Sequence, residues 1–238
     1  MSRWRIIGLV AAKDLRIERR SRVVTNQVLP FGVVTLVLFA FALDAKSVET
    51  ENGVNPIFQL VTPGLVAMAT LFSLLLVVQR SFAVESDDGA LDALRVAGVD
   101  PAAIFWGKSL ALGLELLVLE VIFLLGALVL YDVGLPLGGV PLLAGTMVAA
   151  TSGLAFVGTL YGGLIAGFAG RETLLPLLVL PVVAPVLIGA TRAFESALGT
   201  GGVALAEGWP WLGLLAVFAI AFGVGGALAF GPLIDEAT

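Results

Sequence analysis

The sequence predicts an all-α polytopic membrane protein with six transmembrane helices, preceded by a helix that lies at the membrane surface. Of the 238 residues, 59% are hydrophobic and only 13% are charged, against about 25% charged residues in an ordinary soluble domain. Six apolar stretches are each long enough to cross a hydrocarbon layer about 30 Å thick. Seven of the 13 basic residues precede the first stretch.

The expected spans follow one another with short connections, so the whole chain, 1–238, is predicted to be a single membrane domain. Their bounds are about 24–43, 57–78, 108–131, 140–168, 173–191 and 211–231. The longest connection, 79–107, joins the second and third spans. If alternate connections lie on the same side of the membrane, eleven of the 13 basic residues fall on one side, and only Lys46 and Arg192 fall on the other. The positive-inside bias then predicts that both termini and the 79–107 connection are cytoplasmic.

Residues 1–22 have the pattern of an amphipathic interfacial helix. Its apolar residues share one helical face, namely Trp4, Ile7, Ala11 and Leu15. The opposite face carries the basic residues Arg5, Lys13, Arg16 and Arg20, and Asp14 and Glu18 interrupt the apolar side. Two interpretations fit this pattern: an anchor on anionic lipid, or an elbow helix that couples to a cytoplasmic partner.

The 79–107 connection contains two signals for a helix start. Ser86, Asp87 and Asp88 offer N-cap side chains ahead of a short predicted helix over 90–96. Asp100 followed by Pro101 combines a cap residue with proline at the first helical position. Because a disordered tether would not need caps, we expect a docked structural element here. A solvated charged hairpin without a partner is the alternative.

Two carboxylates fall inside the third predicted span, Glu115 and Glu120. An ionised carboxylate at mid-membrane costs several kcal/mol, so these side chains are expected to face protein or water, or to be protonated. Five positions apart on a helix, they diverge by about 140° and do not form one acid–base pair. Two roles remain open for these carboxylates: a structural hydrogen bond to a neighbouring span, or a place on a polar substrate path.

The fourth and fifth spans carry features that affect how the helices pack. Small residues recur every four positions in the fourth span, at Gly158, Gly162, Ala166 and Gly170, which favours close helix approach, either within the bundle or in a homodimer. The fifth span contains Pro176, Pro181 and Pro185. Such prolines occur on transport pathways and also in ordinary spans.

The composition argues against catalysis and metal binding by this chain. It has no His and no Cys, so neither a Ser-His nor a Cys-His nucleophile can be assembled, and thiolate and imidazole metal ligands are absent. Gly107, Lys108 and Ser109 resemble the end of a phosphate-binding loop, but Ala102 stands where that motif needs glycine. An active transporter would therefore need its ATPase on a separate chain.

The run RSFAVESDDGALDALRVAGVDPAAIFWGKSLA resembles the CcmB family, the heme exporter permeases within the type-2 ABC permease group. The positions that match this family are Pro63, Gly64, Arg80, Ser81, Phe82, Glu85, Gly89, Ala90, Leu91, Gly107 and Lys108. Lys13-Asp14-Leu15, followed by Glu18, Arg20 and Ser21, and the run LLPLLVLPVVAPVLIGA also look like this family. The likeness covers nearly the whole chain.

The resemblance implies a permease of the prokaryotic cytoplasmic (inner) membrane that supplies or releases heme for cytochrome c maturation. Its implied partners are a CcmA-like ABC ATPase, which binds ATP, and CcmC-like and CcmD-like membrane subunits; a second copy of the chain is a further candidate. Heme is the implied cargo, and nucleic acid has no role. The expected docking surface for the ATPase comprises Arg80, Phe82, Glu85, Asp87, Asp88, Gly89, Leu91, Leu94 and Arg95, with Trp4, Ile7, Lys13, Asp14 and Arg16 of the interfacial helix.

The residues favour a partner as the holder of heme, so no cofactor is expected on this chain alone. Heme iron usually takes His, Cys, Met or Tyr as its axial ligand. The first two are missing, which leaves Met68, Met147, Tyr131 and Tyr161 in or near the spans. Two other functions remain as alternatives: a type-2 ABC exporter permease for another substrate, such as a lipid or a drug, and a membrane scaffold that moves nothing.

Overall fold

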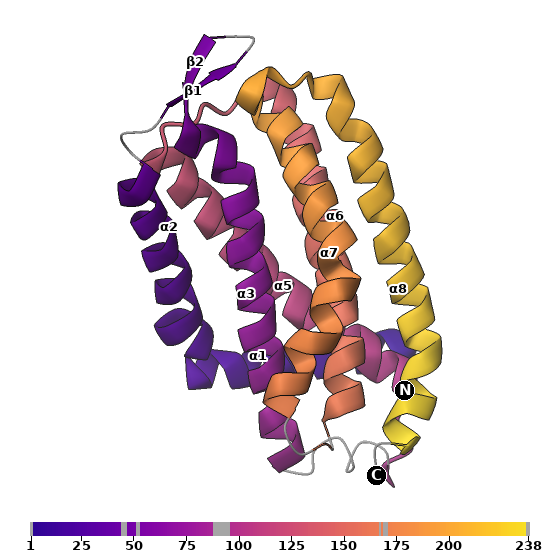
Figure 1. Ribbon diagram of the computed structural model, residues 1–238. Coiled ribbons are helices and arrows are strands. Elements are labelled where there is room, and N and C mark those ends of the chain that lie inside the picture. The colour runs from indigo at the N-terminus through magenta and orange to yellow at the C-terminus, as the bar shows by residue number, and fades with distance from the viewer. Residues whose placement is uncertain are drawn as a thin grey trace.

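The computed structural model describes residues 2–43, 47–50, 53–87, 96–166, 168 and 171–236 of the chain (Figure 1). Long helices dominate these residues, and six of them are long and apolar enough to cross a membrane, which confirms the predicted fold class. The long helices are α1 (Arg3–Ser21), α2 (Leu29–Leu43), α3 (Ile57–Asp87), α5 (Pro101–Leu130), α6 (Val140–Ile165), α7 (Arg171–Leu198) and α8 (Gly208–Glu236).

Short elements connect these helices. A π-helical turn, η1 (Val24–Val28), leads directly into α2, and a strand pair lies between α2 and α3. Three 3-10 turns complete the described connections: η2 (Leu137–Gly139), η3 (Thr200–Gly202) and η4 (Leu205–Glu207).

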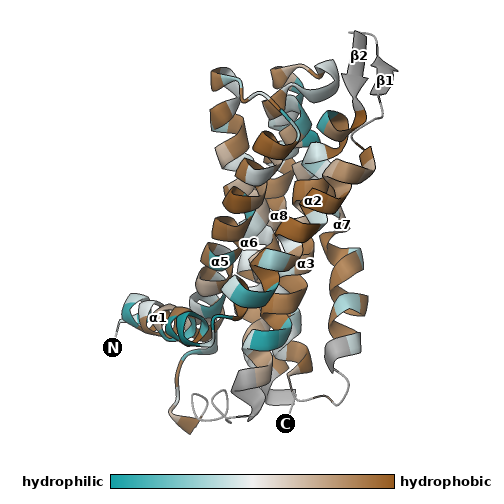
Figure 2. Ribbon diagram, turned by 90° about the vertical axis from the view of Figure 1, so that its left-hand side faces the viewer, coloured by the Kyte–Doolittle hydropathy of each residue, from teal (hydrophilic) through white to brown (hydrophobic). Residues whose placement is uncertain are grey.

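Helix α1 lies across one end of the bundle, whereas the other long helices run along it (Figures 1 and 2). Hydrophobic residues dominate the long helices of the bundle, while hydrophilic residues gather on α1 and near the helix ends (Figure 2). Both chain ends lie at the α1 end of the bundle. This arrangement is the one expected for an interfacial helix followed by six spans.

Four helices run further than hydropathy indicates, among them α8, which continues to Glu236. Helix α3 continues to Asp87, α5 begins at Pro101, and α7 ends at Leu198 with all three of its prolines inside one continuous helix. Backbone hydrogen bonds hold a helix together whether or not its side chains are apolar. The hydrophobic stretches therefore indicate where the chain crosses the membrane and not where its helices end.

The continuation of α3 corrects the first predicted helix start. Ser86 and Asp87 lie in the last turn of α3, so they do not cap a new helix. The remainder of that prediction, Asp88 and the short helix over 90–96, falls almost wholly on residues 88–95, outside the described residues. The second helix start is confirmed, because Asp100 accepts a hydrogen bond of 3.2 Å from the backbone N–H of Ala102 and Pro101 opens α5.

A β-hairpin lies between α2 and α3, at the end of the bundle opposite α1 (Figure 1). Its strands, β1 (Ser47–Thr50) and β2 (Gly53–Pro56), pair antiparallel, with Ser47 opposite Pro56 and Thr50 opposite Gly53. From its composition, 44–56 is a polar and acidic connection between the first two predicted spans. The four residue pairs of this register were missed because short strands of mixed polarity give only a weak periodic signal.

Helix α6 packs closely against α3 at two glycines. A Cβ atom at Gly158 would lie 2.8 Å from side-chain atoms of Leu74 and Val78, and one at Gly162 would lie 2.5 Å from the Phe82 ring. At these two positions the small residue serves packing within the chain. Ala166 ends α6 as its C-cap residue, and Gly170 lies outside the described residues.

Candidate functional site

Helix α1 is held against the start of α5 by a very close backbone approach. A Cβ atom at Gly107 would lie 2.6 Å from the Cβ of Val10 and 2.9 Å from the carbonyl oxygen of Ile7, so a larger residue does not fit there. The buried positions of α1 are Val10 and Ala11. The predicted apolar face agrees with this contact at Ala11, which is 4% exposed, but it did not include Val10, and Trp4 is 82% exposed.

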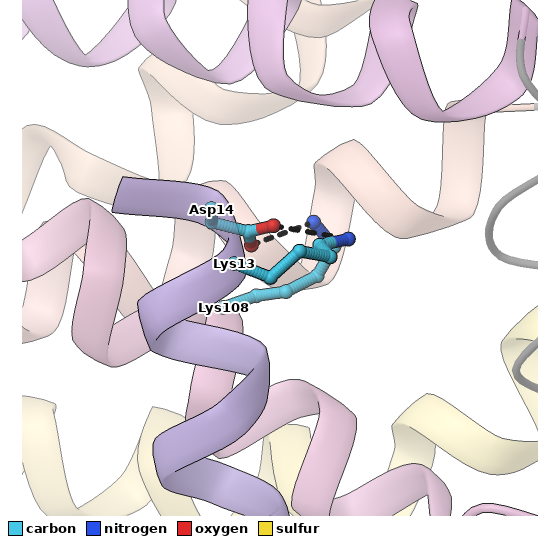
Figure 3. Close-up of polar contacts among 3 residues, drawn as sticks. All are labelled: Lys13, Asp14 and Lys108. Atoms are coloured by element: carbon cyan, nitrogen blue, oxygen red, sulfur yellow. Dashed lines mark hydrogen bonds and ion pairs between the residues drawn. The ribbon is translucent and has the colours of Figure 1, made fainter. Parts of the chain in front are cut away.

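An ion-pair cluster joins the same two helices (Figure 3). One carboxylate oxygen of Asp14 lies 3.2 Å from Nζ of Lys108 on α5, and the other lies 3.1 Å from Nζ of Lys13. The Lys108 side chain is only 3% exposed and that of Asp14 is 10% exposed. A lysine this deeply buried requires a compensating charge, and Asp14 provides one.

Helix α3 completes this junction from a third direction. The Phe82 ring lies under the Lys108 ammonium, whose nitrogen is 4.6 Å from the ring centroid, in a cation–π arrangement. Phe82 is itself 4% exposed, because it fills the space left by Gly162 on α6. One aromatic side chain thus contacts both α6 and the charge pair that holds α1.

A small cavity of about 40 Å³ lies where α1, α3 and α5 meet. Its polar lining comes from all three helices: Asp14, Glu18 and Ser21 of α1, Arg80 and Ser81 of α3, and Glu115 of α5. The space is large enough for water. Glu115 therefore faces a cavity that it shares with Arg80 and other charged residues, and its surroundings are not lipid alone. Glu120 is 2% exposed and does not line this cavity.

Glu18 organises the turn by which the chain leaves α1 and enters the membrane. Its carboxylate accepts a 2.6 Å hydrogen bond from the backbone N–H of Val24 and a 3.2 Å hydrogen bond from the Ser21 hydroxyl. Arg22 takes a left-handed conformation, with φ of 54°, and its N–H donates to the Glu18 carbonyl. The side chain of Glu18 thus fixes the elbow between the surface helix and the first span.

Other predicted site residues lie around this junction. Arg16 and Arg80 are exposed, and Ile7 is half-buried. Glu85 and Asp87 lie on the last turns of α3, so the backbone carries them beyond the junction on the α1 side of the bundle. The remaining predicted docking residues, Asp88, Gly89, Leu91, Leu94 and Arg95, lie outside the described residues.

Sequence reasoning missed how these residues pair. It placed Lys108 in a motif and Asp14 on a helix face without connecting them, and it did not single out Val10. The available signal was the presence of Asp14 and Glu18 on the apolar side of α1. Acidic residues in a contact face need cationic or N–H partners, and a lysine at the start of a span is a natural candidate.

The junction contains no arrangement suited to covalent chemistry; its groups are charge pairs, a ring and a packed glycine. Its physical effect is mechanical, because α1, α3 and α5 are tied by contacts that resist separation. A displacement imposed on α1 or on the end of α3 would therefore be passed to the start of α5.

Comparison with known proteins places the chain in a family. A sequence model described as "CcmB protein" matches residues 5–232. The chain is 28% identical to "Heme exporter protein B" of Pseudomonas aeruginosa over 197 residues, which cover 81% of this chain and 82% of that protein. It is 30% identical to the protein of the same name from Paracoccus denitrificans over 192 residues, covering 79% and 82%.

The match extends across the junction as well as the spans. A third similar protein, "Heme exporter protein B" of Rhodobacter capsulatus, is 29% identical over 181 residues, covering 74% of this chain and 77% of that protein. The family match begins at residue 5 and ends at residue 232, so it contains most of α1, the elbow, and nearly the full length of the six helices able to cross a membrane. This chain is a multi-pass membrane protein that belongs to the CcmB protein family.

Proposed function

We propose that this chain is the permease subunit of an ABC complex that supplies or releases heme for cytochrome c maturation. The observation that carries the proposal is the family match over residues 5–232, together with relatives named "Heme exporter protein B". Physical support comes from residues that carry the resemblance in both segments, since Asp14 of α1, Phe82 of α3 and Lys108 of α5 meet at one junction.

In this proposal the energy source is a separate CcmA-like ATPase that docks on the α1 side of the bundle. Glu85 and Asp88 would meet basic residues of the ATPase, and Leu91 and Leu94 would enter its groove. The junction of α1, α3 and α5 would then carry the motion into the membrane, because Phe82 and Lys108 connect the end of α3 to both other helices. CcmC-like and CcmD-like subunits complete the proposed assembly.

The proposed location is the prokaryotic inner membrane, with both termini in the cytoplasm. Support comes from the exposed arginines of α1, among them Arg5, Arg16, Arg19 and Arg20, which lie at the bundle end shared by both termini. Basic residues concentrate on the cytoplasmic side of membrane proteins. Arg192, in contrast, lies toward the far end of α7 and pairs with Glu195 at 2.9 Å.

We further propose that a partner holds the heme iron. Of the four Met and Tyr side chains in or near the spans, Met147 and Tyr131 are buried in the core, and the Tyr131 hydroxyl donates a 2.7 Å hydrogen bond to the Leu36 carbonyl. Tyr161 is half-buried. Met68 is 48% exposed and shares a groove between α3 and α7 with Arg192 and Glu195. A single thioether is a weak basis for a heme site without His or Cys.

The decisive experiment is reconstitution of the complex in vesicles with an acceptor for heme. ATP-dependent delivery of heme is expected, and it should disappear when this chain is omitted. Cells that lack the chain should fail to make holocytochrome c. Normal holocytochrome c in such cells would overturn the proposed function, whatever the purified complex does.

Docking is tested by reversing charge on the proposed surface. Glu85→Lys combined with Asp88→Lys should abolish co-purification of the ATPase with the full chain. The matched control is Glu207→Lys, which reverses an exposed charge in η4, at the opposite end of the bundle. If the ATPase still co-purifies with the double variant as it does with the control, the docking surface is wrong even where the function is right.

A further inference from the structure

A groove opens between the first two turns of α1 and the first three turns of α5, on the side away from the charged junction. Its volume is about 550 Å³. Arg3, Trp4 and Ile7 line it from α1, while Asp100, Trp106 and Leu110 are among the residues that line it from α5. None of these side chains takes part in the Asp14–Lys108 cluster, so the groove needs its own explanation.

The groove changes from polar to apolar along its length. Asp100, Ala103, Trp106 and Leu110 follow one another at helical spacing on a single face of α5. Ten residues of α-helix rise about 15 Å, so the groove runs from the level of α1 well into the bilayer. It begins at the Arg3–Asp100 ion pair and reaches Leu110, which is 47% exposed within a membrane span.

Aromatic packing holds the wall of the groove in place. The Trp106 ring packs edge-on against Phe156, with centroids 5.2 Å apart, and against Phe105 at 5.8 Å. A Cβ atom at Gly223 of α8 would lie 3.1 Å from the Trp106 ring, so α8 closes this side. A preformed apolar wall of this kind binds an alkyl chain without having to reorganise first.

The mouth of the groove holds a largely exposed guanidinium. The Arg3 Nε lies 2.8 Å from an Asp100 carboxylate oxygen, yet the Arg3 side chain remains 78% exposed. A guanidinium has five N–H donors, so Arg3 can neutralise Asp100 and still donate to a phosphate. Trp4, 82% exposed, is a residue type enriched at membrane interfaces.

We propose that this groove is a binding site for one anionic glycerophospholipid of the leaflet on the α1 side. An acyl chain would lie along Trp106 and Leu110, and the head-group phosphate would meet Arg3. The site would join α1 to the bilayer at its N-terminal end, whereas the Asp14–Lys108 pair joins it to the protein further along. This inference concerns lipid and does not depend on which cargo the complex handles.

Tryptophan fluorescence offers a direct test, because Trp4 and Trp106 line the groove and the other two tryptophans, Trp209 and Trp211, lie in the first turn of α8. The full chain with Trp209→Phe and Trp211→Phe is reconstituted in phosphatidylcholine vesicles. Small amounts of brominated phosphatidylglycerol, or of brominated phosphatidylcholine, are then added as quenchers. We expect about a fivefold lower half-quenching concentration for the anionic lipid, the preference that one arginine contact provides.

Three variants separate this site from general attraction to a basic helix. Arg3→Gln should remove the preference, while Arg19→Gln, the same change on an exposed residue near the other end of α1, should retain it. Asp100→Asn keeps an N-cap side chain and frees Arg3, so it should retain or increase the preference.

The proposal fails if both brominated lipids quench alike, as they would if a helix of a partner subunit or bulk lipid occupied the groove. Equal losses in the Arg3 and Arg19 variants would also overturn it. Loss of the preference in Asp100→Asn would overturn it too, because the effect of Arg3→Gln would then follow from disruption of the ion pair itself.

Discussion

Asp14 on α1 and Lys108 on α5 form an ion pair of 3.2 Å across 94 positions of sequence. The lysine is almost completely buried, and its ammonium lies over the Phe82 ring of α3. A surface helix that only floated on lipid would have no need of a buried charge pair. The pair therefore attaches α1 to the helix bundle, and α1 is expected to move together with the first turns of α5.

Replacing either partner is expected to loosen α1. Asp14→Ala takes a carboxylate away from a lysine that is 3% exposed and should cost about 3 kcal/mol of stability. Lys108→Met should cost less, because it removes the buried charge, keeps an apolar side chain and leaves Asp14 beside Lys13. Thermal unfolding of the purified chain in detergent measures both, and the double variant gives the coupling energy, expected at about 1 to 3 kcal/mol.

An exposed ion pair provides the control for this prediction. Arg192 and Glu195 on α7 are 2.9 Å apart, with the arginine side chain 58% exposed. Glu195→Ala should cost less than about 1 kcal/mol, as is usual for pairs in contact with water. If Asp14→Ala proves no more costly than Glu195→Ala, the buried pair does not hold α1 in place.

The six-span fold can be predicted from the sequence, whereas the junction of α1, α3 and α5 can be predicted only in part. Apolar stretches longer than 18 residues have one stable outcome in a membrane, so hydropathy suffices to count spans. The Asp100-Pro101 helix start was also predictable, because capping depends on adjacent residues. Pairing of Asp14 with Lys108 depends on which face of α1 meets α5, and a packing geometry of that kind is not encoded locally.

The same distinction explains two positions at which the α1 face differs from the prediction. Helical periodicity placed Trp4 with Ile7 on the apolar side, yet Trp4 is 82% exposed and Val10 is buried. The closest approach of α1 to α5 is set by the missing side chain at Gly107. A glycine on one helix can thus select the contact face of another, which an analysis of either helix alone does not reveal.

Gly107→Ala is expected to push α1 away from α5. The new Cβ would lie 2.6 Å from the Cβ of Val10 and 2.9 Å from the Ile7 carbonyl oxygen. A backbone oxygen cannot move away unless the helix itself moves. We expect a loss of about 2 kcal/mol and faster cleavage of α1 by protease in vesicles or detergent. Gly113→Ala is the matched control on the same helix, because its Cβ would meet Ala155 at an ordinary 3.6 Å. Equal protease resistance of the two variants would contradict the close approach.

Gly162→Ala tests the contact between α6 and Phe82. Its Cβ would lie 2.5 Å from the Phe82 ring and 2.9 Å from Val78, so the ring that supports Lys108 must shift. Stability should fall by about 1 to 3 kcal/mol, and adding Phe82→Leu should restore part of the loss, since Val78 remains. Gly225→Ala on α8, where nothing lies within 4 Å, should instead stabilise slightly through helix propensity. A neutral Gly162→Ala variant would show that α3 and α6 are less tightly packed than described.

Tyr131 ties α2 to the bundle at the end opposite α1, and its removal should loosen that helix selectively. Its hydroxyl donates a 2.7 Å hydrogen bond to the Leu36 carbonyl, and its ring packs against Phe58 with centroids 5.9 Å apart. Tyr131→Phe keeps the ring and should cost about 1 kcal/mol, the usual net contribution of one hydrogen bond. Tyr131→Leu also loses the aromatic packing and should cost about 1 kcal/mol more.

Amide hydrogen exchange should rise in α2 more than in α6 or α7 for both variants, because α2 packs mainly against α3 and α5. A uniform rise over all helices would show that the hydroxyl stabilises the bundle as a whole, and unchanged exchange in Tyr131→Phe would exclude the hydrogen bond as the tie.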